Sequence, residues 1–518
     1  MKIRLIKIFK LCFYLCFTLI ISIYITCGFI FFNWHSTSRI PNEGLKNKIS
    51  NYIIRNIGAE ICYKAYSFNP IFLSNKSDYK LMFSKKDKFL NDSIVNLALS
   101  NNEFLTFSDD LKVWKKASIL TKEGLFDIKY KFHGTSLTPY SQGKASFKIK
   151  SKHPINGFKN FRLISDESSY KSFFFNDFAN QYDLICEDII ALLLFSGYNG
   201  TKLYLQSSGF SNNYLKTKYN IENVFKFKSM DEWYNDFPRA HVNNLDGVGY
   251  AIEVNHNDMP IDIHRKKHLN SFIKIRNGNI KDIAKSDYKY FGEFLGLLYF
   301  FGHPHQVTGD NDTWINVKDR LLPIYRNEGH IDALNCNKGN FDNYLWETYY
   351  KTNSLIPYKK LLLNDSIRNF RNLLFNDLVI KKDSLLTKFD SLFESFKNTY
   401  YNYDYRYFKL KKEHFQFREN IKHNINLIKE YLKITELAAY IDSDTLRITA
   451  DSYVNVDVIV NSKLFTVIKP RKYSINDDQI TTCLVNHKLY YPNKIHEITF
   501  RNSITKDTIS NKRLSVIY

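Results

Sequence analysis

Residues 301–316 read FGHPHQVTGDNDTWIN and join an apolar, helix-like run to a strand-like run. Before them, residues 288–301 carry aromatic and aliphatic side chains at mixed helical spacing, which predicts a helix. After them, residues 314–325 alternate well enough to predict a short hairpin around Lys318 and Asp319. The polar residues between the two elements therefore form a loop that packed structure braces on both sides, and such loops often hold reacting groups.

This loop contains Asp310 and Asn311, the best candidates for catalytic residues. A carboxylate beside a carboxamide orients a hydroxyl and binds a hard cation such as Mg²⁺, which prefers oxygen ligands. Gly-Asp-Asn-Asp is also good turn chemistry, so an ordinary turn is the alternative. His303 and His305 invite a zinc hypothesis, but Pro304 separates them and zinc needs three or four nitrogen or sulfur ligands. A structural role for His305 fits better.

Three segments upstream follow one another in a characteristic order, and they read KFHGTS at 131–136, KASFKIK at 144–150 and NGFKNFRLI at 156–164. Together with Asp310-Asn311 and a closing strand at Pro323, their order and spacing resemble the CotH kinase family, the spore coat protein H-like atypical kinases. The resemblance covers roughly residues 125–330. It implies a helix at 170–182, followed by a helix, a strand and a turn within 188–209.

The resemblance implies an α+β, atypical protein-kinase-like fold that transfers the γ-phosphoryl group of ATP to Ser or Thr of surface or secreted proteins. Mg²⁺ or Mn²⁺ would be the metal cofactor. Lys148, or else Lys144, would hold the nucleotide phosphates, since alternate residues of a strand face the same side. Ser136 would lie on the turn that closes over the phosphates. The alternatives are the solvated face of an edge strand and an ordinary turn.

Asp310 would also bind the metal, and relatives place a second acidic residue after the closing strand. Here no Asp stands there, so Asn327 or Glu328 would complete the metal shell. The Glu that follows a Tyr-Leu pair in relatives is missing after residues 214–215, and Glu222 is the nearest substitute. These departures keep open a second hypothesis, a catalytically inactive surface scaffold that binds an anionic polymer or a coat protein.

The N-terminus carries positive charge followed by an apolar run. Residues 11–34 contain no charged side chain, and as a helix they would span about 36 Å, enough for a bilayer core of about 30 Å. Lys2, Arg4, Lys7 and Lys10 precede the run, which predicts a cytoplasmic N-terminus. We therefore expect a single-pass anchor in the cytoplasmic membrane, with the main domain outside the cytoplasm. A cleaved signal peptide is the alternative.

The length and composition, 518 residues with 44% hydrophobic side chains, suit a protein with more than one core. We expect five parts in the chain. They are a transmembrane anchor (1–34), a linker and N-terminal extension (35–110), a CotH kinase-like core (111–345), a helical lobe (346–435) and a small all-β, β-sandwich-like module (436–518).

The net charge of +21, from 73 basic and 52 acidic residues, suits an anionic partner such as an acidic polymer or a membrane surface. The chain has no Arg-rich patch interleaved with aromatic residues, so nucleic acid is not an expected partner. The seven cysteines include no CxxC pair, and neither a zinc site nor a dense disulfide framework is indicated.

Overall fold

In the computed structural model, the described residues group into two units, which are taken in turn below. The first unit takes its residues from 1–173, 187–214 and 392–414, and the second from 174–186, 215–391 and 415–518. The structure describes residues 13–19, 21–22, 26, 77–84, 113–133, 145–164, 169–195, 201–221, 226–229, 251–253, 263–276, 279, 281, 283–302, 307, 312–317, 320–326, 330–338, 341–348, 356–403, 407–434, 436–442, 445–451, 454–468, 485–488, 497–509 and 514–517.

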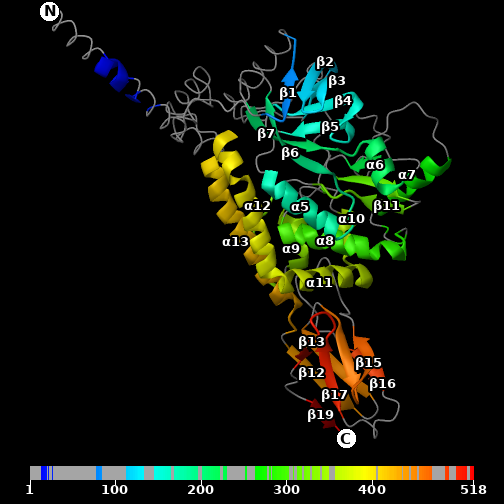
Figure 1. The fold of residues 1–518 in the computed structure, drawn as a ribbon. Helices are drawn as coiled ribbons and strands as arrows, with labels where there is room; N and C mark the ends of the chain where they lie inside the picture. Colours follow the sequence, from blue (N-terminus) through cyan, green and yellow to red (C-terminus); the bar gives the residue numbers. More distant parts are fainter. Residues whose placement is uncertain are drawn as a thin grey trace, which may run out of the picture. The chain divides into compact units, whose positions relative to one another are not determined.

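The first unit is built around a closed barrel with the strand order β1-β2-β3-β4-β5-β7-β6 (Figure 1). The strands are β1 (Tyr79–Met82), β2 (Lys115–Thr121), β3 (Gly124–Phe132), β4 (Phe147–Ile155), β5 (Phe158–Ile164), β6 (Ile189–Phe195) and β7 (Thr201–Ser207). β1 closes the sheet because it pairs antiparallel with β2 and parallel with β6. Inward and outward residues alternate, so Tyr130 and Phe132 of β3 are buried while Lys129 is exposed.

The closed barrel corrects the expected atypical protein-kinase-like fold. The described residues form a mixed helix and strand structure with a seven-stranded barrel. Periodicity along the chain predicts strands but does not tell which distant strands pair, and β1, which closes the barrel, comes from the stretch expected to be an N-terminal extension. Closure therefore depends on pairing between strands more than 100 positions apart, Tyr79 with Leu194.

The segment between residues 169 and 209 is only partly as predicted. The helix expected at 170–182 is confirmed as α5 (Ser169–Gln181). Within 188–209 the expected helix is wrong, because β6 stands in its place and pairs antiparallel with β7. The expected strand and turn are confirmed as β7 and the turn at Gly209. β6 reads IIALLLF, and periodicity alone does not separate a short apolar run of this kind from a piece of buried helix.

The predicted transmembrane anchor over residues 11–34 is also corrected. Among the residues that the structure describes, no helix is long and apolar enough to cross a membrane. The described helical residues of this region are 13–19, 21–22 and 26. An apolar composition meets one requirement of a membrane span, but a span also needs about 20 residues in a single helix.

The second unit contains a four-stranded sheet with the order β11-β10-β8-β9. Its strands are β8 (Lys226–Ser229), β9 (Ala251–Glu253), β10 (Thr313–Val317) and β11 (Arg320–Pro323). The remaining helices of the described chain are α6 (Asn212–Tyr219), α7 (Ile263–Arg276), the 3₁₀ helix η5 (Lys285–Asp287), α8 (Tyr288–Phe301), α9 (Phe341–Thr348), α10 (Ile356–Leu361), α11 (Asp365–Ile380), α12 (Lys382–Tyr403) and α13 (Tyr407–Leu432).

Most of helix α8 is buried. Phe291 and all residues from Phe294 to Phe301 are buried, and the non-glycine residues among them are at most 2% exposed. Two glycines let α11 approach it closely. A Cβ atom at Gly292 would lie 2.6 Å from Cβ of Phe370, and one at Gly296 would lie 2.8 Å from a Leu374 methyl group. Only a helix without side chains at these positions can pack this closely.

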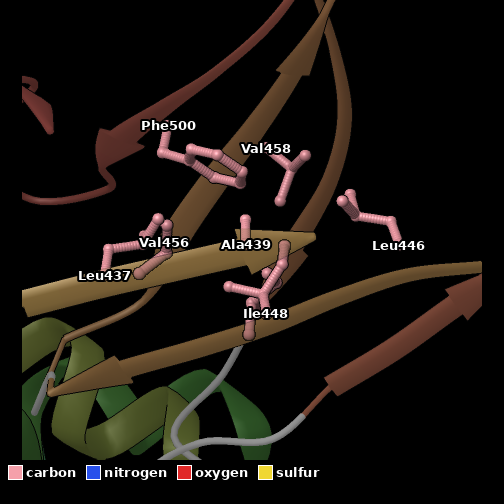
Figure 2. Packing of buried hydrophobic residues seen from close by; sticks show 8 residues of the cluster. Leu437, Ala439, Leu446, Ile448, Val456, Val458 and Phe500 are labelled. Atoms are coloured by element: carbon pink, nitrogen blue, oxygen red, sulfur yellow. The ribbon is translucent and has the colours of Figure 1, made fainter. Parts of the chain in front are cut away.

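The C-terminal part of the second unit has two four-stranded sheets, in the orders β16-β13-β12-β19 and β15-β14-β17-β18. The strands are β12 (Glu436–Asp442), β13 (Thr445–Asp451), β14 (Val456–Val460), β15 (Lys463–Ile468), β16 (Val485–Lys488), β17 (Ile498–Asn502), β18 (Thr508–Ile509) and β19 (Leu514–Ile517). Figure 2 shows side chains of both sheets in one cluster, with Leu437 and Ile448 from the first facing Val456 and Phe500 from the second. The two sheets therefore share one apolar core.

Candidate functional site

Lys148, the predicted phosphate-binding lysine, lies on β4 of the barrel with its side chain half-buried. Its direct neighbours across the sheet are Lys131 on β3 and Arg162 on β5. Residues directly opposite each other in antiparallel strands have their side chains on the same face. Because Phe147 and Ile149 point into the barrel core, this row of three cations lies on its outer face.

Arg162 is held by polar groups at the end of the row. Its guanidinium forms an ion pair with the Glu187 carboxylate, and its Nη2 donates to Oγ of Ser207 over 3.2 Å. The Ser207 hydroxyl donates to Glu187 and accepts from the backbone N–H of Gly209 over 3.0 Å. Gly209 has a φ of 57°, and a Cβ there would lie 3.3 Å from Nε of Arg162. These contacts fix the orientation of the guanidinium.

A second row of outward lysines runs beside the first. Lys116 on β2 is opposite Lys129 on β3, which is opposite Lys150 on β4. Trp114 joins the rows, since Nζ of Lys150 lies 4.5 Å from the centre of its ring and Nζ of Lys131 lies 5.1 Å from it. Such contacts between a cation and an aromatic face are attractive.

We call this surface the cation face, and its members are Lys116, Lys129, Lys131, Lys148, Lys150 and Arg162. Asp127, which accepts from Oγ of Ser118 over 3.2 Å, adds a carboxylate at its border, and Glu187 adds another. The lysine pattern in the sequence predicted the part on β4. The contributions of β2, β3 and β5 depend on strand register and were not predicted.

Of the other predicted site residues, Lys144, Ser136, Asp310, Asn311, Asn327 and Glu328 lie outside the described residues. So do His303, His305 and Glu222. In the part of the chain that the structure describes, no three His, Cys, Asp or Glu side chains gather as a metal site. The predicted metal ligands therefore stay a prediction.

The two elements that brace the loop are confirmed. α8 spans Tyr288–Phe301, and β10 pairs antiparallel with β11, with Val317 opposite Arg320. Gly302 ends α8 and Asp312 directly precedes β10, so these two residues flank the predicted loop.

Asp312 is a polar residue of this loop that the sequence did not single out. It is 1% exposed, and one oxygen, Oδ1, accepts from the indole N–H of Trp314 over 2.8 Å and from the hydroxyl of Tyr358 over 2.6 Å. The signal for it was the nearby Trp314, because a buried indole N–H needs an acceptor. These two hydrogen bonds fix the Asp312 carboxylate at the start of β10.

The comparisons with known proteins do not assign the chain to a family. No model of a protein family matches the chain, and no curated protein matches it. The CotH resemblance is thus carried only by the sequence segments that suggested it.

Proposed function

We propose that the cation face binds a phosphate-bearing ligand. The observation that carries this proposal is the row Lys131, Lys148 and Arg162, which crosses three adjacent strands on one face. Strands lie about 4.8 Å apart, so neighbouring side chains of the row reach the oxygens of one phosphate chain. Lysine supplies point charges, while a guanidinium fixed by Glu187 and Ser207 supplies a planar fork of donors.

We further propose that the ligand is ATP and that the chain is a CotH-like protein kinase acting on Ser or Thr of surface or secreted proteins. Lys148 would hold the phosphates while Asp310 takes the proton of the acceptor hydroxyl. The γ-phosphoryl group then passes to the hydroxyl oxygen and ADP leaves. Mg²⁺ or Mn²⁺ would neutralise charge on the phosphates, with Asp310 and Asn327 or Glu328 as its protein ligands. The assignment is supported by the presence of α8 before the predicted loop and of the β10–β11 pair after it.

A second candidate function is the binding of an anionic polymer without catalysis. It is favoured by the exposed row of Lys116, Lys129 and Lys150, which widens the cation face beyond what one nucleotide needs. Each lysine would contact a different charge along the polymer, and such binding weakens strongly with salt.

One set of variants tests both candidates in the full chain. Lys148→Met should weaken ATP binding by about tenfold to a hundredfold, which is the effect of losing one charged hydrogen-bond donor. Lys159→Met is the matched control, because Lys159 is an exposed lysine of β5 outside both rows, and it should bind ATP as the wild type does. Asp310→Ala should lose phosphate transfer to an acceptor protein.

The outcomes separate the candidates. Loss of ATP binding in Lys148→Met, with transfer lost in Asp310→Ala, supports the kinase. If the wild type neither binds ATP nor incorporates phosphate, the kinase proposal is wrong. Binding of long-chain polyphosphate that Lys148→Met and Lys150→Met weaken equally would then support the polymer scaffold, and unchanged polyphosphate binding in both variants would refute it.

A further inference from the structure

Two cations lie close together on one face of the four-stranded sheet in the second unit. Lys226 of β8 is directly opposite Ile315 of β10, and Thr313 lies two residues before Ile315, so Lys226 and Thr313 share a face. Nη2 of Arg326 donates to Oγ1 of Thr313 over 3.0 Å. Arg326 follows β11, and its segment is tied to β10 by the N–H of Ile324, which donates to the Thr313 carbonyl over 2.8 Å.

The opposite face of this sheet is apolar and already covered. Phe227 of β8 stacks on Phe272 of α7 with ring centres 5.3 Å apart, and Phe272 also contacts Trp314 at 6.1 Å. Lys226 alternates with Phe227 along β8 and therefore lies on the other face. Lys226 and Thr313 thus lie on the face opposite to Phe227 and Trp314, beside the buried side chain of Ile315.

The surroundings of Lys226 disfavour the protonated, charged form of its amino group. Burial and, after it, repulsion from Arg326 lower the pKa of Lys226 from 10.5 to about 8. In the part of the chain that the structure describes, no carboxylate forms an ion pair with Lys226. Among the described residues the Lys226 ammonium gains no opposite charge for the hydration that it loses, and an anion beside it would offset this cost.

We propose that Lys226, Arg326 and Thr313 bind one phosphate group. The ammonium would supply a point charge and the guanidinium a planar pair of donors. The Thr313 oxygen already accepts from Arg326, which leaves its hydroxyl proton to donate to the anion. The site belongs to the second unit and shares no residue with the cation face, so it does not depend on the proposed function. It also places positive charge directly before Asn327, one of the predicted metal ligands.

The test follows the reactivity of Lys226 in the full chain, because only the deprotonated amine is acylated. Limited acetylation at pH 8 followed by peptide mass spectrometry should label Lys226 faster than Lys411, an exposed lysine of α13 that serves as the internal control. Inorganic phosphate, with ionic strength held constant by sodium chloride, should slow labelling of Lys226 saturably. The expected protection is about tenfold at ten times the dissociation constant, and Lys411 should not change.

Separate arms identify the source of the phosphate group. Protection by inorganic phosphate indicates a site for the free ion, and stronger protection by AMP or ATP indicates a phosphate ester. Lys148→Met should leave all of these protections unchanged, so failure of the proposed function and failure of this site give different results. If neither phosphate nor the nucleotides slow labelling of Lys226, the proposal is refuted.

Two variants complete the test. In Arg326→Gln, acetylation of Lys226 can still be followed, and phosphate should no longer slow it. Lys226→Met should melt at the same or a higher temperature than the wild type in chloride, because it removes the repulsion, and it should lose the rise in melting temperature that phosphate gives the wild type. A phosphate-induced rise that persists unchanged in both variants would contradict the assignment of these residues.

Discussion

Replacement of Gly302 by alanine should strongly destabilise the structure around the end of α8. Gly302 ends the helix with a φ of 67°, and its N–H bonds back to the carbonyls of Leu298 and Tyr299. A Cβ atom at this position would lie 2.2 Å from the carbonyl oxygen of Asp332 and 3.2 Å from Nδ2 of Asn424. The first of these contacts is with backbone and cannot be relieved by a side-chain rotation.

The expected loss has three parts. Alanine in the left-handed region costs about 1–2 kcal/mol. The collision with Asp332 costs about 1–3 kcal/mol, as overpacking usually does. Relief of the collision moves Asn424, whose Nδ2 donates to the carbonyls of Phe300 and Asp332 over 2.9 and 2.8 Å and whose Oδ1 accepts from the N–H of Leu334 over 2.9 Å. Weakening this network costs about 1 kcal/mol more, for a total of about 3–6 kcal/mol.

Hydrogen exchange followed by mass spectrometry is the suitable assay, because it reports the stability of the structure around α8 separately from the rest of the chain. Peptides that cover α8 and α13 should exchange faster in Gly302→Ala by the factor that corresponds to the lost free energy. Gly157→Ala is the matched control, since Gly157 has a φ of 81° and no atom lies within 4 Å of the position that the alanine methyl group would take, so only the backbone strain applies. Equal losses of local stability in the two variants would show that the collision argument is wrong.

Two further predictions concern buried charges in the second unit. Burial raises the pKa of Glu293 from 4.5 to about 7, so the folded state binds more protons than the unfolded state in this window and stability should fall as pH rises from about 4.5 to 7. Glu293→Gln should remove this fall and be about 1–2 kcal/mol more stable than the wild type at pH 8, a value discounted for partial exposure and checked by melting curves across pH. Arg371 is fully buried and paired with Asp342 over 2.5 Å, so Asp342→Ala should cost about 3–5 kcal/mol, and adding Arg371→Met should recover most of that loss in thermal melts. A double variant no more stable than Asp342→Ala would contradict the second prediction.

The sequence by itself determined the local elements around the predicted loop. Residues 288–301 form the predicted helix, and their apolar side chains are dense enough to bury it on nearly every side. β10 and β11 form the predicted antiparallel pair, although nearly all of their residues are buried and do not alternate. The outward position of Lys148 follows from the alternation of strand residues, because Phe147 and Ile149 on either side of it are buried. These features depend on neighbours within a few positions along the chain.

Tertiary structure alone decided which distant residues meet. β1 closes the barrel by pairing with β6, Arg162 meets Glu187 and Ser207, and Lys226 comes beside Arg326 only through the register of β8 on β10. A one-dimensional pattern records the face of a strand but not its partner, because strand pairing is set by hydrogen bonds and packing between segments far apart in sequence. For the same reason the sequence showed a row of lysines on β4, while the structure extended it into a cation face across four strands.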